Sequence, residues 1–304
     1  MKRFIFRSLF FLFPVAAVLV AWELYMRSFP HVFKYKRTVV VENCRKNGEI
    51  VFLGSSHAYF GVNTEKLPGA YNLSYVSQSL LHDRFIFEQL VSKPHKLKYV
   101  AVPVSVFSFF AAEGGLEEWR ERDYVRHWDY PERSFTDKFY ILDNIPQQLI
   151  YVRKYAKRLK RKGIFQTFHI SPTGWGTAYE AAGDVKEFEK IGKQAAMRHC
   201  NVLLDRTENF AALQAIIKMA LQHNIKVILY TPPGHRTYVA HLNAHQEDKM
   251  RSMLAELSSG KDVYYLDLLR EPEFKDEDFF DPDHMSNKGA EKLALKLYQF
   301  YKNK

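Results

Sequence analysis

The sequence predicts an α/β fold, in which a mostly parallel sheet has helices on both faces and follows one N-terminal transmembrane helix. Short apolar segments of strand length, such as residues 50–53 and 225–230, alternate with segments of helical periodicity, such as residues 78–91 and 210–222. This alternation is typical of parallel sheets, because each crossover between parallel strands needs a helix. The chain of 304 residues is long enough for one large α/β domain.

The N-terminal segment is basic and then apolar. Three basic residues among the first seven precede an unbroken apolar stretch over residues 9–22. A bilayer needs about 20 such residues, and the stretch reaches that length if residues 4–6 and 24–26 are counted. We therefore interpret residues 1–26 as an uncleaved signal anchor. This predicts a single-pass protein of the cell (inner) membrane, whose main domain is extracytoplasmic or periplasmic.

A cleaved signal peptide is the alternative for the same segment. Ala21 could precede a cleavage point, but Leu19 is too large for a clean Ala-x-Ala site. The orientation is inferred from the compact basic cluster at the N-terminus, although further basic residues follow the span. A third reading is a hydrolase that stays in the cytoplasm, which requires that this segment does not insert.

The rest of the chain divides into two parts in the sequence. Residues 27–48 read as a linker or an edge segment, in which residues 38–41 could form a short strand. Residues 49–304 carry the alternating α/β pattern. Within them, residues 110–200 are rich in charge and aromatic side chains, and include a predicted helix over residues 140–162. We interpret residues 110–200 as an insertion or lid over the sheet edge.

The net charge of +10 favours anionic partners. Nucleic acid is not expected as a partner of an extracytoplasmic domain. Seven basic residues crowd positions 153–162, and they form either a solvated helix face or a contact with anionic lipid headgroups or an anionic glycan. Cys44 and Cys200 have no zinc spacing, and are either one disulfide or two buried thiols.

Candidate chemistry lies at two places far apart in the sequence. The first predicted strand ends at Gly54, and Ser55 and Ser56 follow at once. Ligands bind at such carboxyl edges of α/β sheets. Near the end of the chain, Asp281 precedes His284 by three residues in a loop before the last helix. The carboxylate can hold one ring nitrogen, which leaves the other free to take a proton from a serine hydroxyl.

These two blocks resemble the SGNH/GDSL hydrolase superfamily. Ser56 falls on the nucleophile of the family's first block, and Asp281 and His284 fall on its Asp-x-x-His. The resemblance implies a three-layer flavodoxin-like fold and a catalytic triad of these three residues. The similarity is greatest to membrane-anchored members of cell-envelope assembly, namely the lipoteichoic acid D-alanyl transfer protein and the alginate and peptidoglycan O-acetylation proteins.

The same resemblance implies an esterase or an O-acyltransferase that acts on a cell-envelope glycan, with a multi-span membrane acyltransferase as a partner. The family builds its oxyanion hole from three blocks. Here Ser56 and Ser77 are the candidate backbone donors of the first two. The third block, after the strand that ends near Val104, has Ser105 but no Gly-x-Asn-Asp. That departure keeps a non-catalytic glycan-binding or envelope assembly protein open as the alternative.

Three further residues are candidates for substrate binding. His57 follows the nucleophile directly, and His235 follows a predicted strand that ends in Thr231-Pro232-Pro233-Gly234. Trp175 lies between two glycines, where the indole either stacks on a sugar ring or packs as a plug. No phosphate loop, dinucleotide motif or metal-ligand spacing is found in the sequence, so no cofactor and no metal are predicted.

Overall fold

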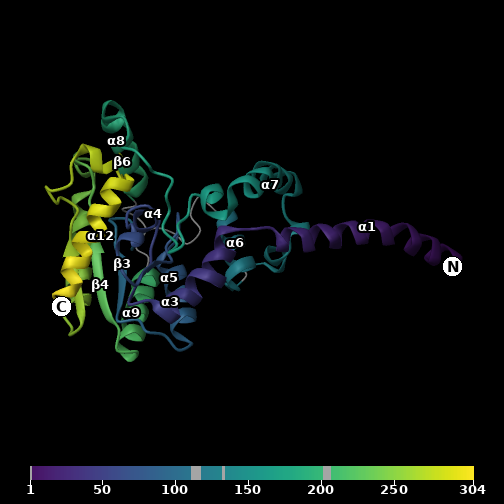
Figure 1. Ribbon diagram of the computed structural model, residues 1–304, viewed down its shortest axis with the longest axis horizontal. Helices are drawn as coiled ribbons and strands as arrows, with labels where there is room; N and C mark the ends of the chain where they lie inside the picture. Colours follow the sequence, from purple (N-terminus) through teal and green to yellow (C-terminus); the bar gives the residue numbers. More distant parts are fainter. Residues whose placement is uncertain (1, 111–117, 132–133, 201–206) are drawn as a thin grey trace. The chain divides into compact units, whose positions relative to one another are not determined.

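The computed structural model describes residues 2–110, 118–131, 134–200 and 207–304 (Figure 1). The chain divides into two compact units. Unit 1 consists of residues 1–35 and 118–168, and unit 2 consists of residues 36–117 and 169–304. The chain therefore begins in unit 1, passes into unit 2 for three strands, and returns to unit 1 before unit 2 is completed.

Unit 2 is built on a five-stranded parallel sheet in the order β2-β1-β3-β4-β5. The strands are β1 (Ile50–Phe52), β2 (Ala70–Asn72), β3 (Tyr99–Pro103), β4 (Lys226–Thr231) and β5 (Val263–Asp267). The predicted α/β fold with a parallel sheet is confirmed. Because the strands run in one direction, all their carboxyl ends lie at one edge, where β1 is flanked by β2 and β3.

Helices cover both faces of this sheet. Side chains of alternate strand residues point to opposite faces. Ile50 and Phe52 on one face pack in a core cluster with Leu293 and Leu297 of α12 (Asn287–Lys302). The helices α5 (Leu80–Val91) and α9 (Thr207–Gln222) pack against each other on the opposite side of the sheet (Figure 1). The result is the predicted three-layer arrangement.

Unit 2 contains further helices, one hairpin and several short turns outside the five-stranded sheet. They are α3 (Val41–Asn47), α4 (Ser56–Tyr59), α8 (Phe188–His199), α10 (Arg236–Val239), α11 (Ala244–Leu257), a two-stranded antiparallel hairpin of β6 (Phe279–Asp281) and β7 (His284–Met285), and the 3-10 turns η2 (Thr64–Lys66), η5 (Val185–Glu187) and η6 (Asp276–Asp278). Both cysteines are free thiols, so the disulfide alternative does not hold.

Residues 27–48 are largely helical, which differs from the linker or edge segment that the sequence suggested. Residues 38–41 form no strand, because they belong to the π-helical η1 (Lys36–Val40) and to the start of α3. Val40 and Cys44 are fully buried. The apolar run therefore supplies one face of a packed helix, whereas a strand would have placed alternate residues on opposite sides.

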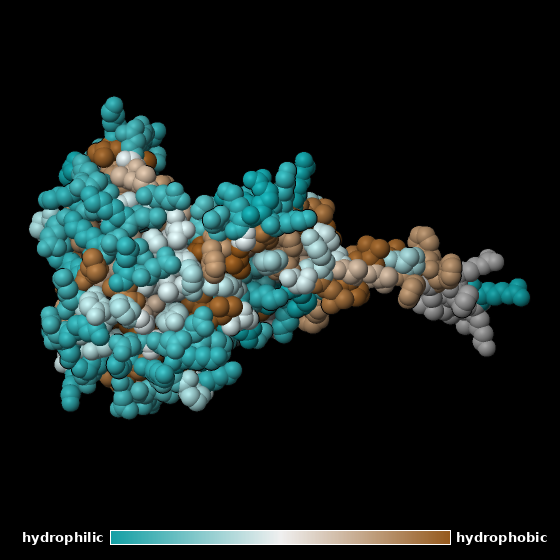
Figure 2. Space-filling view, in the orientation of Figure 1, coloured by the Kyte–Doolittle hydropathy of each residue, from teal (hydrophilic) through white to brown (hydrophobic). Residues whose placement is uncertain are grey.

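Unit 1 is entirely helical in the part that the structure describes. Its elements are α1 (Lys2–Ser28), α2 (Val32–Tyr35), α6 (Glu118–Trp128), the 3-10 turns η3 (Phe135–Lys138) and η4 (Tyr140–Leu142), and α7 (Ile145–Phe168). In α1, the 19 residues Phe10–Ser28 are long and apolar enough to cross a membrane. Figure 2 shows hydrophobic side chains along this helix, and Phe10 and Phe13 are more than 70% exposed.

The segment 110–200, which the sequence suggested as one insertion, is shared between the two units. Residues 118–168 belong to unit 1, and residues 169–200 belong to unit 2. Within unit 1, α6 packs on the N-terminal part of the chain, where the ring of Phe33 contacts Tyr124 edge-on at 4.7 Å. Such pairing between distant segments leaves no local pattern in the sequence. Residues 111–117 lie outside the described residues.

Candidate active site

The turn that follows β1 positions Ser56 at the carboxyl edge of the sheet. Gly54 has a φ of +109°, and a Cβ on this residue would lie 2.2 Å from the ring of Pro103. A side chain there is therefore excluded both by conformation and by space. Ser55 is the N-cap of α4, and Ser56 is the first residue of that helix.

The buried carboxyl group of Asp83 binds the same turn. Asp83 of α5 is 1% exposed and accepts a 2.7 Å hydrogen bond from the backbone N–H of Gly54. It also accepts a hydrogen bond of 2.6 Å from the side-chain amide of Gln78. Burial raises the pKa of Asp83 to about 7, although both hydrogen bonds act in the opposite direction. The turn that precedes Ser56 is thus tied to α5.

The hairpin of β6 and β7 supplies the other half of the site. Asp281 ends β6, and one of its carboxylate oxygens accepts hydrogen bonds from the backbone N–H groups of Asp283 and His284. The ring nitrogen Nδ1 of His284 lies 2.9 and 3.0 Å from the two oxygens of the same carboxylate. The carboxylate therefore fixes the orientation of the imidazole and holds its proton on Nδ1.

The two halves meet at a single hydrogen bond. His284 Nε2 lies 2.9 Å from the hydroxyl oxygen of Ser56, although the two residues are 228 positions apart in the sequence. With Nδ1 protonated, Nε2 accepts the hydroxyl proton. The structure thus brings together Ser56, His284 and Asp281, in the order that nucleophilic catalysis by a serine requires.

A second carboxylate, which the sequence analysis did not select, lies near the same ring nitrogen of His284. Asp283 is 6% exposed, and its Oδ2 lies 3.7 Å from His284 Nδ1. Burial alone would lower the pKa of His284, but Asp283 and Asp281 outweigh it, so the pKa stands above its usual value. Burial likewise opposes ionisation of Asp283, yet the neighbouring imidazoles hold its pKa well below the usual range.

Two further histidines surround Asp283. His57 Nε2 lies 3.7 Å from its Oδ2, and His199 Nε2 lies 3.9 Å from the same atom. Both distances exceed a direct hydrogen bond, so the interaction is electrostatic. Burial lowers the pKa of both rings, that of His199 to about 3, and both are neutral imidazoles at pH 7. His57 Nδ1 lies 2.6 Å from the hydroxyl of Ser105.

The predicted oxyanion residues lie in different surroundings. Ser56 has its backbone N–H in the first turn of α4, where helix amides have no partner within the helix. Ser77 is exposed and has a left-handed φ of 59°. The N–H of Ser105 already donates to the hydroxyl of Ser108, and its own hydroxyl contacts His57. Ser105 therefore lies in the cluster around Asp283 with its amide already engaged.

The three residues that were predicted to bind substrate also lie in different surroundings. His57 lies near the other three side chains, because its ring centroid is 5.2 Å from that of His284. Of the two alternatives for Trp175, the structure agrees with the packing plug, because this residue is 5% exposed and its indole N–H donates to the carbonyl of Phe60. His235 is buried, and its two ring nitrogens contact Thr237 and Asp276. Trp175 and His235 are thus packing residues.

An aromatic wall, which the sequence analysis also missed, flanks the imidazole of His284. The ring of Tyr179 is stacked between the rings of Phe60 and Phe280. The centroid distances are 4.0 Å to Phe60 and 3.9 Å to Phe280. Its edge meets the ring of His284 at 5.7 Å. Burial raises the pKa of Tyr179 to about 12, so its hydroxyl is neutral. No local signal marks this wall, because its members come from three separate segments.

Two groups of side chains approach the geometry of a metal site. His57, Asp283 and His284 have ligand atoms within 4.8 Å of one another, but Nδ1 of His284 is already bonded to Asp281. In unit 1, His31, Asp123 and His127 form a similar group. The rings of His31 and His127 are stacked at 4.4 Å and 15°, so their lone pairs run side by side and do not converge on one ion.

A serine at the end of the first strand of a parallel sheet, opposed by Asp-x-x-His before the last helix, is the arrangement that the resemblance to the SGNH/GDSL hydrolase superfamily led us to expect. The chain belongs to a protein family described as "Protein of unknown function (DUF1574)", whose model matches residues 33–297. A comparison with curated proteins finds no match.

Several solved structures are similar to this chain at 12% sequence identity. A GDSL-like lipase from Bacteroides thetaiotaomicron aligns with a TM-score of 0.40 over 90% of this chain and 99% of its own. A proposed acylhydrolase from Bacteroides fragilis aligns with a TM-score of 0.39 over 84% and 86%. A proposed platelet activating factor from Streptococcus pneumoniae also aligns with a TM-score of 0.39, over 93% and 97%.

Proposed function

We propose that this chain is a membrane-anchored serine hydrolase or O-acyltransferase that forms an acyl-enzyme on Ser56. The observation that carries the proposal is the 2.9 Å contact between the Ser56 hydroxyl and His284 Nε2, with Asp281 bonded to the opposite nitrogen. A serine hydroxyl is a poor nucleophile until a positioned base takes its proton. The three side chains meet this requirement without rearrangement.

The proposed reaction has two steps. In the first, Ser56 Oγ forms a bond to the carbonyl carbon of an ester while its proton passes to His284 Nε2. The tetrahedral intermediate expels the alcohol, which takes that proton and leaves an acyl group on Ser56. In the second step, water or a sugar hydroxyl gives its proton to His284 and attacks the acyl carbon. The bond from that carbon to Ser56 Oγ then breaks, and His284 returns the proton to Ser56 Oγ. Water as the acceptor gives an esterase, and a glycan hydroxyl gives an O-acyltransferase.

The second carboxylate supports the proton transfer. His284 becomes a cation in both steps, and Asp283 lies 3.7 Å from its Nδ1. A buried negative charge at that distance stabilises the imidazolium more strongly than it would in water. The raised pKa of His284 implies that the base is neutral, and therefore active, only as the pH rises through a value above its usual one.

The oxyanion would be held mainly by backbone groups. The N–H of Ser56 is the proposed first donor, and the N–H of Ser77 is the proposed second. The amide of Ser105 is engaged by Ser108, so the third donor of the family's arrangement has no replacement at that position. One missing donor typically costs about a hundredfold to a thousandfold in rate. We therefore expect a slow turnover compared with that of GDSL-type esterases.

The substrate and location follow from the surroundings of the site. The apolar segment Phe10–Ser28 would anchor the chain in the inner membrane, with unit 2 on the extracytoplasmic side. In the aromatic wall both faces of Tyr179 are covered, so Phe280, which is 36% exposed, offers the stacking surface for a sugar ring or an acyl chain. We propose a cell-envelope glycan as the acceptor, with a multi-span membrane acyltransferase as the partner that supplies the acyl group.

The test is covalent labelling of the full-length chain in detergent with a serine-directed fluorophosphonate. Wild type should be labelled, Ser56→Ala should not, and His284→Ala should be labelled far more slowly. Ser55→Ala is the matched control, because its side chain makes no capping hydrogen bond in α4, and it should be labelled like wild type. Unlabelled wild type, or equal labelling of Ser56→Ala, would reject the proposed nucleophile.

A non-catalytic glycan-binding or envelope assembly protein is the second candidate. The engaged amide of Ser105 favours it, because the site then lacks one donor for the oxyanion. This candidate predicts that the chain binds an acidic polysaccharide with the same affinity in His284→Ala as in wild type, and that no acyl group is released from a model ester.

A further inference from the structure

The positive charge of this protein is concentrated in unit 1. Unit 1 has 17 Lys and Arg against 8 Asp and Glu, which accounts for +9 of the net charge of +10. Unit 2 has 27 basic and 26 acidic residues. The helix α7 contains seven of the cations of unit 1 and no acidic residue. The part of the chain that holds the candidate membrane helix therefore also holds the charge.

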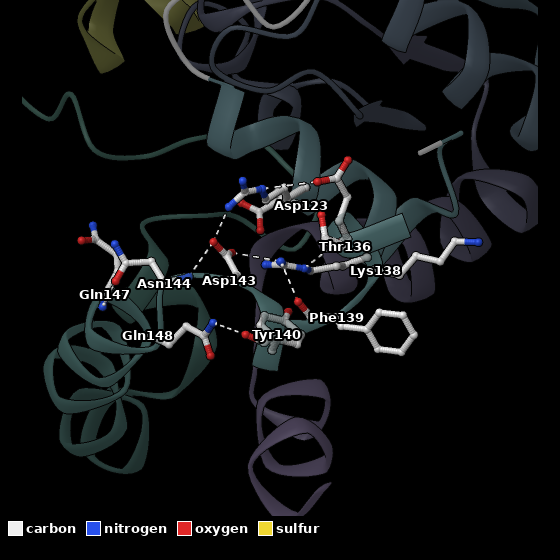
Figure 3. Close-up of polar contacts among 12 residues, drawn as sticks. Asp123, Thr136, Lys138, Phe139, Tyr140, Asp143, Asn144, Gln147 and Gln148 are labelled. Atoms are coloured by element: carbon white, nitrogen blue, oxygen red, sulfur yellow. Dashed lines mark hydrogen bonds and ion pairs between the residues drawn. The ribbon is translucent and has the colours of Figure 1, made fainter. Parts of the chain in front are cut away.

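The cations elsewhere in unit 1 are largely balanced by carboxylates. Figure 3 shows Asp143 at the centre of a network in which it pairs with Arg122 and, at 2.9 Å, with Arg126. Arg122 also lies 3.5 Å from Asp137. At the end of α1, Arg27 pairs with Glu23 at 2.7 Å. The basic cluster of α7 is thus the main excess of positive charge on this unit.

The first turns of α7 are fixed against the end of α1. The indole N–H of Trp22 donates to the side-chain oxygen of Gln148 at 2.8 Å. The Gln148 amide donates to the carbonyl of Tyr140 at 2.7 Å (Figure 3). The ring of Phe29 meets Tyr151 edge-on at 5.8 Å. Tryptophan is enriched where membrane helices reach the headgroups. The start of α7 therefore lies at the level of the membrane interface if the part of α1 before Trp22 spans the bilayer.

The outer face of α7 is apolar at its start and basic beyond it. Leu149 and Ile150 follow the buried Gln148 and are 52% and 63% exposed. Lys154 and Lys157 follow Ile150 at helical spacing and are exposed as well. Figure 2 shows hydrophilic side chains over the region of α7. An exposed apolar pair next to a run of cations is the pattern of a helix that lies in a membrane interface.

We propose that α7 docks on the membrane beside α1 and binds the phosphate headgroups of anionic lipids. Leu149 and Ile150 would enter the outermost apolar layer, and the basic cluster at positions 153–162 would contact the lipid phosphates. A lipid surface fits better than a soluble glycan because it covers the apolar pair as well as the cations. The attachment of Gln148 to Trp22 keeps the helix within reach of the bilayer. This inference is independent of any chemistry at Ser56.

The test uses the full-length chain in lipid nanodiscs with a nitroxide at Ile150→Cys, in a Cys200→Ser background. The relative accessibility of the label to oxygen and to a water-soluble nickel reagent reports its depth. Oxygen accessibility should be higher in discs that contain phosphatidylglycerol than in pure phosphatidylcholine. At 1 M NaCl, where charges are screened beyond about 3 Å, the difference should be lost.

Two pairs of lysine-to-glutamate substitutions provide the test variant and its matched control. Lys157→Glu with Lys160→Glu should weaken docking on the anionic discs at least about 30-fold, from the attraction of two cations near the surface. Lys190→Glu with Lys193→Glu reverses two exposed lysines at the same spacing on α8 and should leave the label unchanged. Equal accessibility of the label in both lipids would overturn the proposal, as would failure of the chain to enter the discs. Shielding of the label by soluble alginate in neutral discs would assign the helix to an acidic glycan and also overturn it.

Discussion

The buried carboxyl group of Asp83 should make the folded state less stable as the pH rises. Its pKa is about 7 in the folded chain and 3.8 in an unperturbed one. The folded state therefore binds this proton more tightly than the unfolded state does. The stabilisation is complete below about pH 4 and is lost progressively as the pH rises from about 4 to 7.

The size of the effect follows from that difference. About three pKa units correspond to about 4 kcal/mol at pH 8, at 1.36 kcal/mol for each unit. Asp83→Asn removes the ionisation while its side-chain oxygen still accepts from the N–H of Gly54. Both hydrogen bonds end on Oδ1, which the amide keeps, whereas the NH2 group that replaces Oδ2 brings two buried donors, which we expect to cost about 1 kcal/mol. We therefore expect the variant to be about 2–3 kcal/mol more stable than wild type at pH 8, and no more stable than wild type at pH 4.

The assay is urea unfolding of the full-length chain in detergent micelles, followed by far-ultraviolet circular dichroism at pH 4, 6 and 8. Asp248→Asn makes the same chemical change at an exposed position of α11, and should change the free energy of unfolding by less than about 0.5 kcal/mol. The reasoning is refuted if Asp83→Asn lowers stability at pH 8, or if its pH dependence matches that of wild type.

Three further predictions concern the site and its support. Asp283→Asn removes the negative charge beside His284 and should shift the midpoint of the pH dependence of fluorophosphonate labelling to lower pH, whereas an unchanged midpoint would show that this carboxylate does not act on the base. Gly54→Ala should destabilise unit 2 by about 2 kcal/mol or more in urea and slow the labelling, because its Cβ would overlap Pro103 at a φ of +109°, and a variant as stable and reactive as wild type would contradict this. Trp175→Phe should lose about 1–2 kcal/mol of stability with its indole hydrogen bond and keep full labelling in the same assay, and a specific loss of labelling would restore a role in substrate binding.

The sheet and the meeting of Ser56 with His284 could be predicted because both depend on local signals. Apolar runs of strand length, a glycine at a strand end and a carboxylate three residues before a histidine are all visible in the sequence. Parallel topology then places the end of β1 at the sheet edge. No knowledge of side-chain packing is needed for this step.

The parts that could not be predicted depend on contacts between distant segments. Asp283 is visible beside His284 in the sequence, but its burial between His57 and His199 depends on α8. Trp175 has flanking glycines that suggest an exposed loop, yet Gly176 lies against the ring of Tyr59, and a Cβ there would be 2.6 Å from it. Close packing, and not flexibility, requires that glycine.

Unit 1 is formed by two separate segments of the chain, and this limits how a soluble fragment can be made. Phe33 contacts Tyr124, Trp22 donates to Gln148, and Glu23 accepts from the backbone N–H of Ile141. Cutting away the first 35 residues would therefore strip α6 and α7 of their covering and leave an aggregation-prone remnant. A shortened version for crystallisation should instead begin within α1, ahead of Trp22, or else replace residues 118–168 with a short connection.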